Sequence, residues 1–348
     1  MTRVLSGGAV DTTRRSLITG ATGLLGSHIA ESLVARGERV RALVRPTSDT
    51  AFLTQLGVEL VTGDLHDPDA IRRAVAGVGV VYHSAAHVGD WGKWPLFQRE
   101  VIDATRNVLD ACGPAGVGRL VYVSSVAAYG HPGRTGAPIT EDDPLGQKLY
   151  RFRDYYSRAK IAAEELVRAA GPLAAVVRPS WIVGPRDRTS LAPLFAAIRR
   201  GRVSIVGRGD NFVNIVAAAD VADGAIRAGT LPAAAGGVFN LCSEGEITQR
   251  EFFATLTAAI GRKPIRRRVP HWMAYSAGVL GEVVGTAIGI KRSPYVTRHS
   301  VSLISRPTRF SIARAREQLG WEPRVGAREG LRRALAWWAE KQAAAGGK

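Results

Sequence analysis

A glycine-rich turn near the beginning of the chain is the feature that most limits the folds open to it. The segment Thr19–Gly26 (TGATGLLG) follows a short apolar stretch and leads into a helical pattern over Leu24–Arg36. Its glycines, Gly20, Gly23 and Gly26, have a spacing that lets backbone N–H groups and a helix N-terminus approach a pyrophosphate closely. The order strand, turn, helix therefore predicts a dinucleotide-binding domain rather than an accidental tight turn.

Short β-branched stretches alternate with amphipathic helical stretches through the first half of the chain. Because a helix follows each strand, successive strands are expected to pair in parallel, with helices on both faces of the sheet. The pattern predicts an α/β fold with a Rossmann-type doubly wound parallel sheet. The predicted strands are Ser16–Thr19, Val40–Val44, Val58–Thr62, Val80–His83, Leu120–Val123 and Ala174–Val177, and the predicted helices are Leu24–Arg36, Asp69–Ala76, Val101–Ala111 and Ser157–Ala170.

The regular alternation ends after Pro185. Glycines punctuate a hairpin-like stretch at 201–209, and a helix over Gln249–Ile260, an apolar stretch from His271 and a helix over Arg328–Lys341 follow. These segments predict a smaller C-terminal substrate lobe. The predicted division is a disordered lead-in over 1–15, a dinucleotide-binding domain over 16–184 with 211–243, and a substrate lobe over 185–210 with 244–342.

Charge and cysteine content narrow the class of protein. The net charge of +17 comes mostly from arginine spread along the chain, with one dense run from Arg262 to Arg268. Since no nucleic-acid recognition motif accompanies this charge, it favours an anionic cofactor over a nucleic-acid partner. Cys112 and Cys242 are far apart in the sequence, which argues against a disulfide framework and a structural zinc. We expect a cytoplasmic protein without a metal.

The apolar stretch Trp272–Ile290 is interrupted by Glu282. Each half is shorter than the ~20 residues of a membrane-spanning helix, so no transmembrane span is expected. Three interpretations of the stretch stay open, namely a lid over the substrate, part of the core, or a peripheral contact with a membrane surface beside its basic neighbours.

The residues after the second and third predicted strands bear on the cofactor. NAD-binding domains usually place an acid after the second strand to hold the ribose hydroxyls, whereas this chain has Arg45. A guanidinium pairs bidentately with phosphate, so Arg45 favours NADP(H), with NAD(H) possible and a plain solvent-facing arginine as the alternative. Asp64 and Leu65 are placed beneath the adenine, although Asp64 is equally compatible with a helix cap or a turn.

Two further segments carry groups suited to proton transfer. Tyr156 and Lys160 are four residues apart on a predicted helix, so both side chains leave the same face. A free phenol has a pKa near ~10 and needs a neighbouring cation, here Lys160, to exchange protons near neutral pH. Ser124 and Ser125 end the predicted fifth strand, at the sheet edge where ligands bind, and strand alternation lets only one of them reach the reacting oxygen.

Together these segments resemble the extended short-chain dehydrogenase/reductase family over nearly the whole chain. The motifs that carry the resemblance are Thr19–Gly26, Asp64-Leu65, His83–Ala86, Ser125, Tyr156 with Lys160, Arg178-Pro179 and Gly184-Pro185. The segments Ala86–Gly92, Asn107–Leu109, Asn214–Val216 and Phe310–Ile312 are similar to the 3β-hydroxysteroid dehydrogenase-like branch.

The resemblance implies a role for each matching residue. Tyr156 is the acid/base, Lys160 activates its phenol and binds the ribose, and Ser125 polarises the substrate, because in the family the serine precedes a stretch ending in Tyr-Gly, as Tyr129-Gly130 does here. A homodimer is the family expectation. One departure is Glu100-Val101, where family members often carry the asparagine of a proton relay. The implied cofactor-binding residues are Gly20, Thr22, Gly23, Leu24, Leu25, Gly26, Arg45, Asp64, Leu65, Ala85, Ala86, Lys160, Pro179 and Ile182.

Apolar bulk among the residues expected to line the substrate lobe favours a hydrophobic substrate over a sugar nucleotide, unless these side chains simply pack between the lobes. The function expected is interconversion of a secondary alcohol and a ketone on a 3β-hydroxysterol or a long-chain 2-alkyl-3-keto acid. The alternatives are a nucleotide-sugar epimerase or dehydratase with tightly bound NAD and a non-catalytic NADP-binding protein. The residues concerned are Trp91, Trp94, Trp181, Trp272, Met273, Val279, Leu280, Val283 and Val284.

Overall fold

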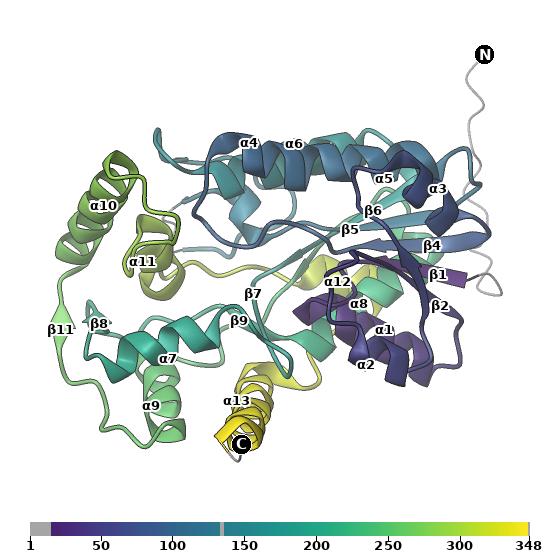
Figure 1. Cartoon of the computed structure of the whole chain (residues 1–348). Coiled ribbons are helices and arrows are strands. Elements are labelled where there is room, and N and C mark those ends of the chain that lie inside the picture. Colours follow the sequence, from purple (N-terminus) through teal and green to yellow (C-terminus); the bar gives the residue numbers. More distant parts are fainter. Residues whose placement is uncertain (1–14, 133–135, 347–348) are drawn as a thin grey trace.

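The computed structural model describes residues 15–132 and 136–346. Its centre is a seven-stranded, fully parallel sheet (Figure 1). The lead-in predicted over 1–15 lies outside the described residues except for Arg15, with which the first strand begins. In sheet order the strands are β10 (Val238–Leu241), β6 (Ala174–Pro179), β5 (Arg119–Val123), β4 (Val78–His83), β1 (Arg15–Thr19), β2 (Val40–Val44) and β3 (Glu59–Thr62).

Helices cover both faces of this sheet, which confirms the doubly wound prediction (Figure 1). Buried aliphatic residues from the strands form a separate apolar cluster with the helices on each side. Helices α1 (Leu24–Ala35), α2 (Ala51–Gln55), α8 (Ala218–Thr230) and α12 (Ala313–Leu319) cover one face, and α3 (Pro68–Val75), α4 (Trp94–Phe97), α5 (Ala104–Cys112) and α6 (Tyr155–Arg168) cover the other. Short 3₁₀ turns lie at η2 (Val126–Tyr129), η3 (Gly171–Leu173) and η4 (Pro232–Ala234).

A smaller lobe lies beyond the carboxyl ends of the strands (Figure 1). A third apolar cluster, which includes Phe195, Phe252 and Leu331, forms its interior. Two parallel strand pairs, β7 (Trp181–Val183) with β9 (Ile215–Ala217) and β8 (Ile205–Val206) with β11 (Arg268–Val269), belong to this part of the chain. Its helices are α7 (Leu191–Arg199), α9 (Gln249–Ala259), α10 (His271–Ala287), α11 (Arg298–Ser305) and α13 (Gly326–Gly346). That the lobes are separate units at the predicted boundaries stays a prediction.

Two details differ from the sequence-based expectation. The stretch at 201–209 is not a hairpin, because β8 pairs in parallel with the distant β11 rather than with a neighbouring strand. The helix expected over Val101–Ala111 begins earlier, with a π-helical segment η1 (Gln98–Asp103) that runs directly into α5. A π turn holds one residue more than an α turn, and apolar periodicity gives no signal for it.

Candidate functional site

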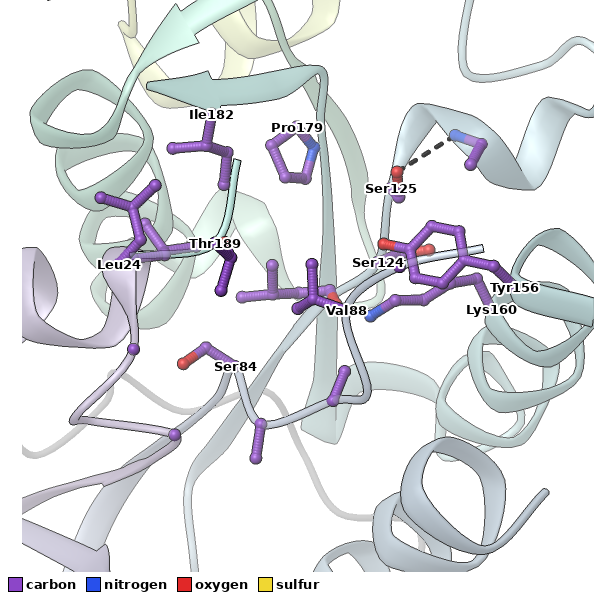
Figure 2. Close-up of a pocket in the computed structure, with 18 of the residues that line it drawn as sticks. Leu24, Ser84, Val88, Ser124, Ser125, Tyr156, Lys160, Pro179, Ile182 and Thr189 are labelled. Carbon is purple, nitrogen blue, oxygen red and sulfur yellow. Dashed lines mark hydrogen bonds between the residues drawn. The ribbon is translucent and has the colours of Figure 1, made fainter. Parts of the chain in front are cut away.

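A cavity of about 680 Å³ opens at the carboxyl ends of the central strands, between the sheet and the smaller lobe. This is the edge at which parallel α/β sheets bind ligands, and the volume is typical of a ligand site. All the residues predicted to bind cofactor or to act in catalysis line this one cavity. Figure 2 shows several of them around it, with Leu24 and Ile182 on one side and Tyr156 and Lys160 on the other.

The glycine turn forms one end of the cavity. A Cβ atom at Gly26 would lie 2.2 Å from the carbonyl oxygen of Gly20, and one at Gly20, where φ is +72°, would lie 2.7 Å from the nitrogen of Ala85. Both positions therefore exclude any side chain. The N-cap of α1 is Gly23, which has no side chain to accept hydrogen bonds from the first-turn N–H groups. A bare helix N-terminus with a close-packed backbone cradle fits a pyrophosphate group.

Two arginines, one in β2 and one directly after it, have different surroundings. Arg41 is buried, donates to Glu59 Oε1 at 3.0 Å and donates to the carbonyl oxygens of Ala74 and Ala76, both at 2.8 Å. Its role is therefore structural. Arg45, by contrast, is exposed and lines the cavity just after β2. This placement fits the predicted contact with an anionic group.

Asp64 is a turn residue, and its predicted place beneath the adenine stays a prediction. Its Oδ1 accepts a hydrogen bond from the backbone N–H of His66 at 2.9 Å, which makes it a turn residue. It also lines the cavity beside Leu65. The N-cap of the following helix α3 is instead Asp67, whose side chain accepts from Asp69 and Ala70.

Ser124 and Ser125 point in different directions. Ser124 is buried and donates to Glu164 Oε2 at 2.7 Å. Ser125 Oγ accepts from the N–H of Ala127 at 3.1 Å. Both serines line the cavity with Tyr156, so the choice of Ser125 over Ser124 as the serine that polarises the substrate stays a prediction.

The Tyr156 and Lys160 side chains lie beside each other on α6 (Figure 2). Burial raises the pKa of the Tyr156 phenol, and the Ser125 hydroxyl acts to lower it. The phenol therefore holds its proton at neutral pH. Burial lowers the pKa of Lys160 to about 8, while the charge of Glu164 acts to raise it. Lys160 Nζ donates to the carbonyl oxygen of Val123 at 2.8 Å, and an ammonium has two further hydrogens to offer.

A buried ion pair joins α6 to strand β6 of the central sheet. Arg178 Nε donates to Glu164 Oε1 at 3.2 Å and to Oε2 at 3.1 Å, and both side chains are almost fully buried. Arg178 Nη1 also donates to Tyr129 Oη at 2.7 Å, and that hydroxyl donates to Asn240 Oδ1 at 2.8 Å. Burial acts to lower the pKa of Arg178, but the hydrogen bonds and charge of Glu164 outweigh it and the pKa is raised.

A second buried polar chain fixes β4 at the floor of the site. His83 Nδ1 lies 2.6 Å from Thr19 Oγ1, and its Nε2 lies 3.0 Å from Thr105 Oγ1. Because Thr105 donates its own hydroxyl proton to the carbonyl of Val101, it can only accept from His83, so Nε2 carries the ring proton. Burial lowers the pKa of His83 to about 3, which keeps the ring neutral.

The far end of the cavity contains polar groups that sequence reasoning missed. His299 of α11 lies with its ring centroid 6.3 Å from that of Tyr156. Arg306, which follows α11, lines the cavity and donates from Nη2 to Tyr150 Oη at 3.2 Å. Its Nη1 is buried and has no hydrogen-bond partner among the described residues. No local motif marks these residues, because the folding of the smaller lobe brings them to the site.

Of the apolar residues expected to surround the substrate, the cavity lining includes Trp181. Trp91 instead donates to the carbonyl of Ile290, and Trp94 packs against Tyr155. The prediction that these residues line the substrate cavity was thus wrong for most of them, because the apolar side of α10 faces away from the cavity. The apolar lining comes instead from Val88, Val126, Pro132, Leu303 and Phe310. The residues that point outward are Trp272, Met273, Leu280, Val283 and Val284.

Glu100 is the residue that stands where members of the family often carry the asparagine of a proton relay. It lies in the π-helical segment η1 and lines the cavity. Its Oε1 lies 3.6 Å from Nε2 of His66. A carboxylate thus stands at the rim of the cavity where the asparagine of the relay was expected.

Comparison with known proteins gives a family match. Residues 16–242 match the model of the NAD dependent epimerase/dehydratase family. The matched segment includes the glycine turn, Ser125, Tyr156 and Lys160.

Several relatives align over nearly their whole length. A 2-alkyl-3-oxoalkanoate reductase from Stenotrophomonas maltophilia is 34% identical over 92% of this chain and 98% of its own. A sterol-4-alpha-carboxylate 3-dehydrogenase (decarboxylating) from Mus musculus is 28% identical over 92% and 90%. Among solved structures, gox2253 superposes with a TM-score of 0.76 at 32% identity, covering 94% of this chain and 98% of its own. MoeE5 in complex with UDP-glucuronic acid and NAD superposes with a TM-score of 0.69 at 26% identity, covering 94% and 99%.

Proposed function

The chain belongs to the NAD-dependent epimerase/dehydratase family, and from that premise we propose that it is an NADP(H)-dependent ketoreductase of long-chain 2-alkyl-3-keto acids. The observation that carries the proposal is the convergence of Ser125, Tyr156 and Lys160 at one wall of a cavity that also contains the glycine cradle. The reductases and dehydrogenases among the relatives support the same class of reaction.

The nicotinamide cofactor supplies the hydride when it is bound. The glycine turn and the N-terminus of α1 would hold its pyrophosphate, and the two remaining hydrogens of Lys160 Nζ would hold a ribose hydroxyl. Arg45, without a competing acid after β2, would pair with a 2′-phosphate. The preference for NADP(H) over NAD(H) rests on this arginine.

The chain's own residues provide proton transfer. The substrate carbonyl oxygen accepts hydrogen bonds from Ser125 Oγ and Tyr156 Oη, which line the same cavity. As negative charge develops on that oxygen, Tyr156 gives up its proton to it. The nearby Lys160 ammonium stabilises the phenolate that is left behind, because an adjacent positive charge favours the ionised phenol. In the oxidative direction the same groups act in reverse.

Arg306 supports an acidic substrate over a neutral sterol. Arg306 lines the cavity, and its Nη1 is buried without a partner among residues 15–132 and 136–346. An unpaired buried guanidinium nitrogen is costly unless a ligand satisfies it. A carboxylate is the complementary group. The apolar lining then suits the alkyl chains of the substrate.

An NADPH oxidation assay on a panel of substrates tests the proposal. The panel contains a long-chain 2-alkyl-3-keto acid, a 3-ketosterol and a UDP-sugar, each with NADPH and NADH. We expect turnover of the keto acid with NADPH. The turnover is measured as the loss of absorbance of the reduced cofactor. Turnover of the UDP-sugar alone, or co-purification with tightly held NAD, would instead favour an epimerase or dehydratase.

Tyr156→Phe tests the role of the phenol. This variant should lower kcat by about 10³-fold, because general acid catalysis contributes about 10²–10⁴-fold, while NADPH affinity stays within about twofold. The matched control is Tyr155→Phe, which removes a hydroxyl from the preceding residue and should retain activity. Equal activity in the two variants would remove Tyr156 from the mechanism.

A further inference from the structure

Helix α10 presents its apolar side to solvent. Its buried positions are Ala274, Gly278, Glu282 and Gly285, so the single carboxylate of the helix points inward. Its outer side bears no charge. The exposed residues, which we call the α10 face, are Trp272, Met273, Leu280, Val283, Val284 and the following Ile288, with exposures of 69%, 46%, 64%, 50%, 46% and 70%. A helix on the surface of a globular protein normally has the opposite polarity.

The inner side of α10 is held too closely for the helix to rotate. Glu282 Oε2 accepts from Arg298 Nε at 2.9 Å, and Glu282 Oε1 accepts from the backbone N–H of Arg298 at 2.7 Å. A Cβ atom at Gly278 would lie 2.8 Å from that same nitrogen, and one at Gly285 would lie 2.7 Å from a side-chain carbon of Ile290. The outward placement of the apolar side is therefore a fixed property of the fold.

Positive charge flanks α10 in the sequence. Between Phe252 and Arg316 the sequence has twelve lysine and arginine residues and one acid, the buried Glu282. The basic residues on either side of α10 are all exposed, and we call them the basic rim. They are Arg262, Lys263, Arg266, Arg267 and Arg268 before the helix and Lys291 and Arg292 after it. Figure 1 shows α10, with β11 leading into it, at the outer edge of the smaller lobe.

We propose that the α10 face and the basic rim dock this protein on the surface of a bilayer that contains anionic phospholipids. An in-plane helix inserts its apolar side at the boundary of headgroups and acyl chains, and neighbouring cations pair with anionic headgroups. Within the described part of the chain no helix is long and apolar enough to cross a membrane, so the contact is with one leaflet. A second copy of the chain is a poor occupant, because a two-fold contact through this face would bring two basic rims together.

The docking face adjoins the mouth of the cavity. Val88 lines the cavity and is 69% exposed. The residues that follow it are attached to the segment after α10, since Trp91 Nε1 donates to the carbonyl of Ile290 at 2.9 Å and Ser293 Oγ donates to Asp90 Oδ1 at 3.4 Å. A lipid-like substrate would thus reach the site from the leaflet on which the protein lies. Docking itself does not depend on the proposed reaction.

Vesicle flotation of the full chain tests the proposal. We expect the protein to float with vesicles of phosphatidylglycerol and phosphatidylcholine at about 0.1 M salt and not with pure phosphatidylcholine. In 1 M salt, where the screening length falls to about 3 Å, binding to the anionic vesicles should weaken strongly. Trp272 fluorescence should shift to the blue on binding, and the Trp272→Phe variant should lack that shift. A protein that stays at the bottom with both vesicle types overturns the proposal.

Paired variants separate this surface from the general effect of net charge. Arg266→Gln with Arg267→Gln should weaken binding about twenty-five-fold, since each cation near an anionic surface is worth about fivefold. The control, Arg332→Gln with Arg333→Gln on α13, removes the same charge from exposed arginines outside the rim and should change binding less than about twofold. An equal loss of vesicle binding in both double variants would show attraction by net charge alone. That result would overturn the assignment of the basic rim as the docking surface.

Leu280→Ser with Val283→Ser tests the apolar part of the surface. Both side chains are exposed, so the thermal midpoint and NADPH binding should stay unchanged while flotation is lost. Sedimentation velocity without lipid gives the oligomeric state of both proteins. If the wild type is an oligomer and this double variant is not, the face belongs to a contact between copies. If flotation persists in this pair, the helix is not the docking element.

Discussion

Neutralising Glu164 gives a sharp test of how the floor of the site is held together. The Glu164 carboxylate is fully buried, faces the Arg178 guanidinium and accepts from Ser124. Glu164→Gln keeps the shape and one acceptor but leaves the arginine charge uncompensated. Breaking a buried ion pair in this way costs about 3–5 kcal/mol, and we expect about 3 because the amide oxygen still accepts.

This cost converts to a measurable change in melting temperature. Unfolding entropy is about 2.1 cal/mol/K per residue, which gives roughly 0.7 kcal/mol/K for a chain of this length. A loss of about 3 kcal/mol therefore lowers Tm by about 4 °C. Calorimetry and urea unfolding followed by circular dichroism both measure the change. The control is Glu165→Gln on the exposed side of the same helix, which should stay within about 0.5 kcal/mol of the wild type.

A third variant separates charge from packing. In Glu164→Leu with Arg178→Met both charges are replaced by apolar groups, and we expect at least half of the lost stability to return, because such replacements are often neutral or better. A Glu164→Gln protein as stable as the Glu165→Gln control would refute the reasoning, since the arginine would then not depend on this carboxylate.

Three further predictions concern ligands and pH. Arg45→Ala should weaken NADPH binding about tenfold and leave NADH binding unchanged in fluorescence titrations, since a charge-assisted contact is worth about 1.5–3 kcal/mol and Arg45 is exposed. Arg306→Met should raise KM for a 2-alkyl-3-keto acid about ten- to a hundredfold without affecting its methyl ester, and equal effects on acid and ester would argue against carboxylate recognition. The pKa of Lys160 falls from the ordinary 10.5 to about 8 in the folded chain, so above pH 8 the unfolded state binds more protons and stability rises with pH. Urea unfolding should therefore show that the free energy of unfolding of the wild type, relative to that of Lys160→Met, rises by about 2 kcal/mol between pH 8 and 9.5. The same change with pH in both proteins would contradict this prediction.

The central sheet and the cofactor end of the site could be predicted because their signals are local. The glycine turn, the arginine after β2 and the Tyr156 and Lys160 pair each consist of residues within one turn or one helix. All of them line the cavity, although their roles in binding and catalysis stay predictions. The choice of Ser125 over Ser124 needed the family pattern, because strand alternation alone leaves both open.

The substrate end could not be predicted in the same way. Arg306 and His299 reach the cavity from α11 and the residue that follows it, where Ser302 and Arg306 hydrogen-bond Tyr150 in the loop before α6, and no spacing in the sequence records that contact. For α10, apolar periodicity located the stretch but not its orientation. The pairing of Glu282 with Arg298, sixteen residues apart, and the close packing of Gly278 and Gly285 show which side faces inward.

The π-helical segment at Gln98–Asp103 has a consequence for changes in chain length. Each residue turns an α-helix by about 100°, and η1 holds one residue more than a regular turn would. Deleting Ile102 would restore the regular winding, leave α5 in place and rotate Glu100 away from the cavity rim. Homologues one residue shorter at this point would thus present a different side chain to the same ligand, so a single deletion there could change selectivity while the sheet stays the same.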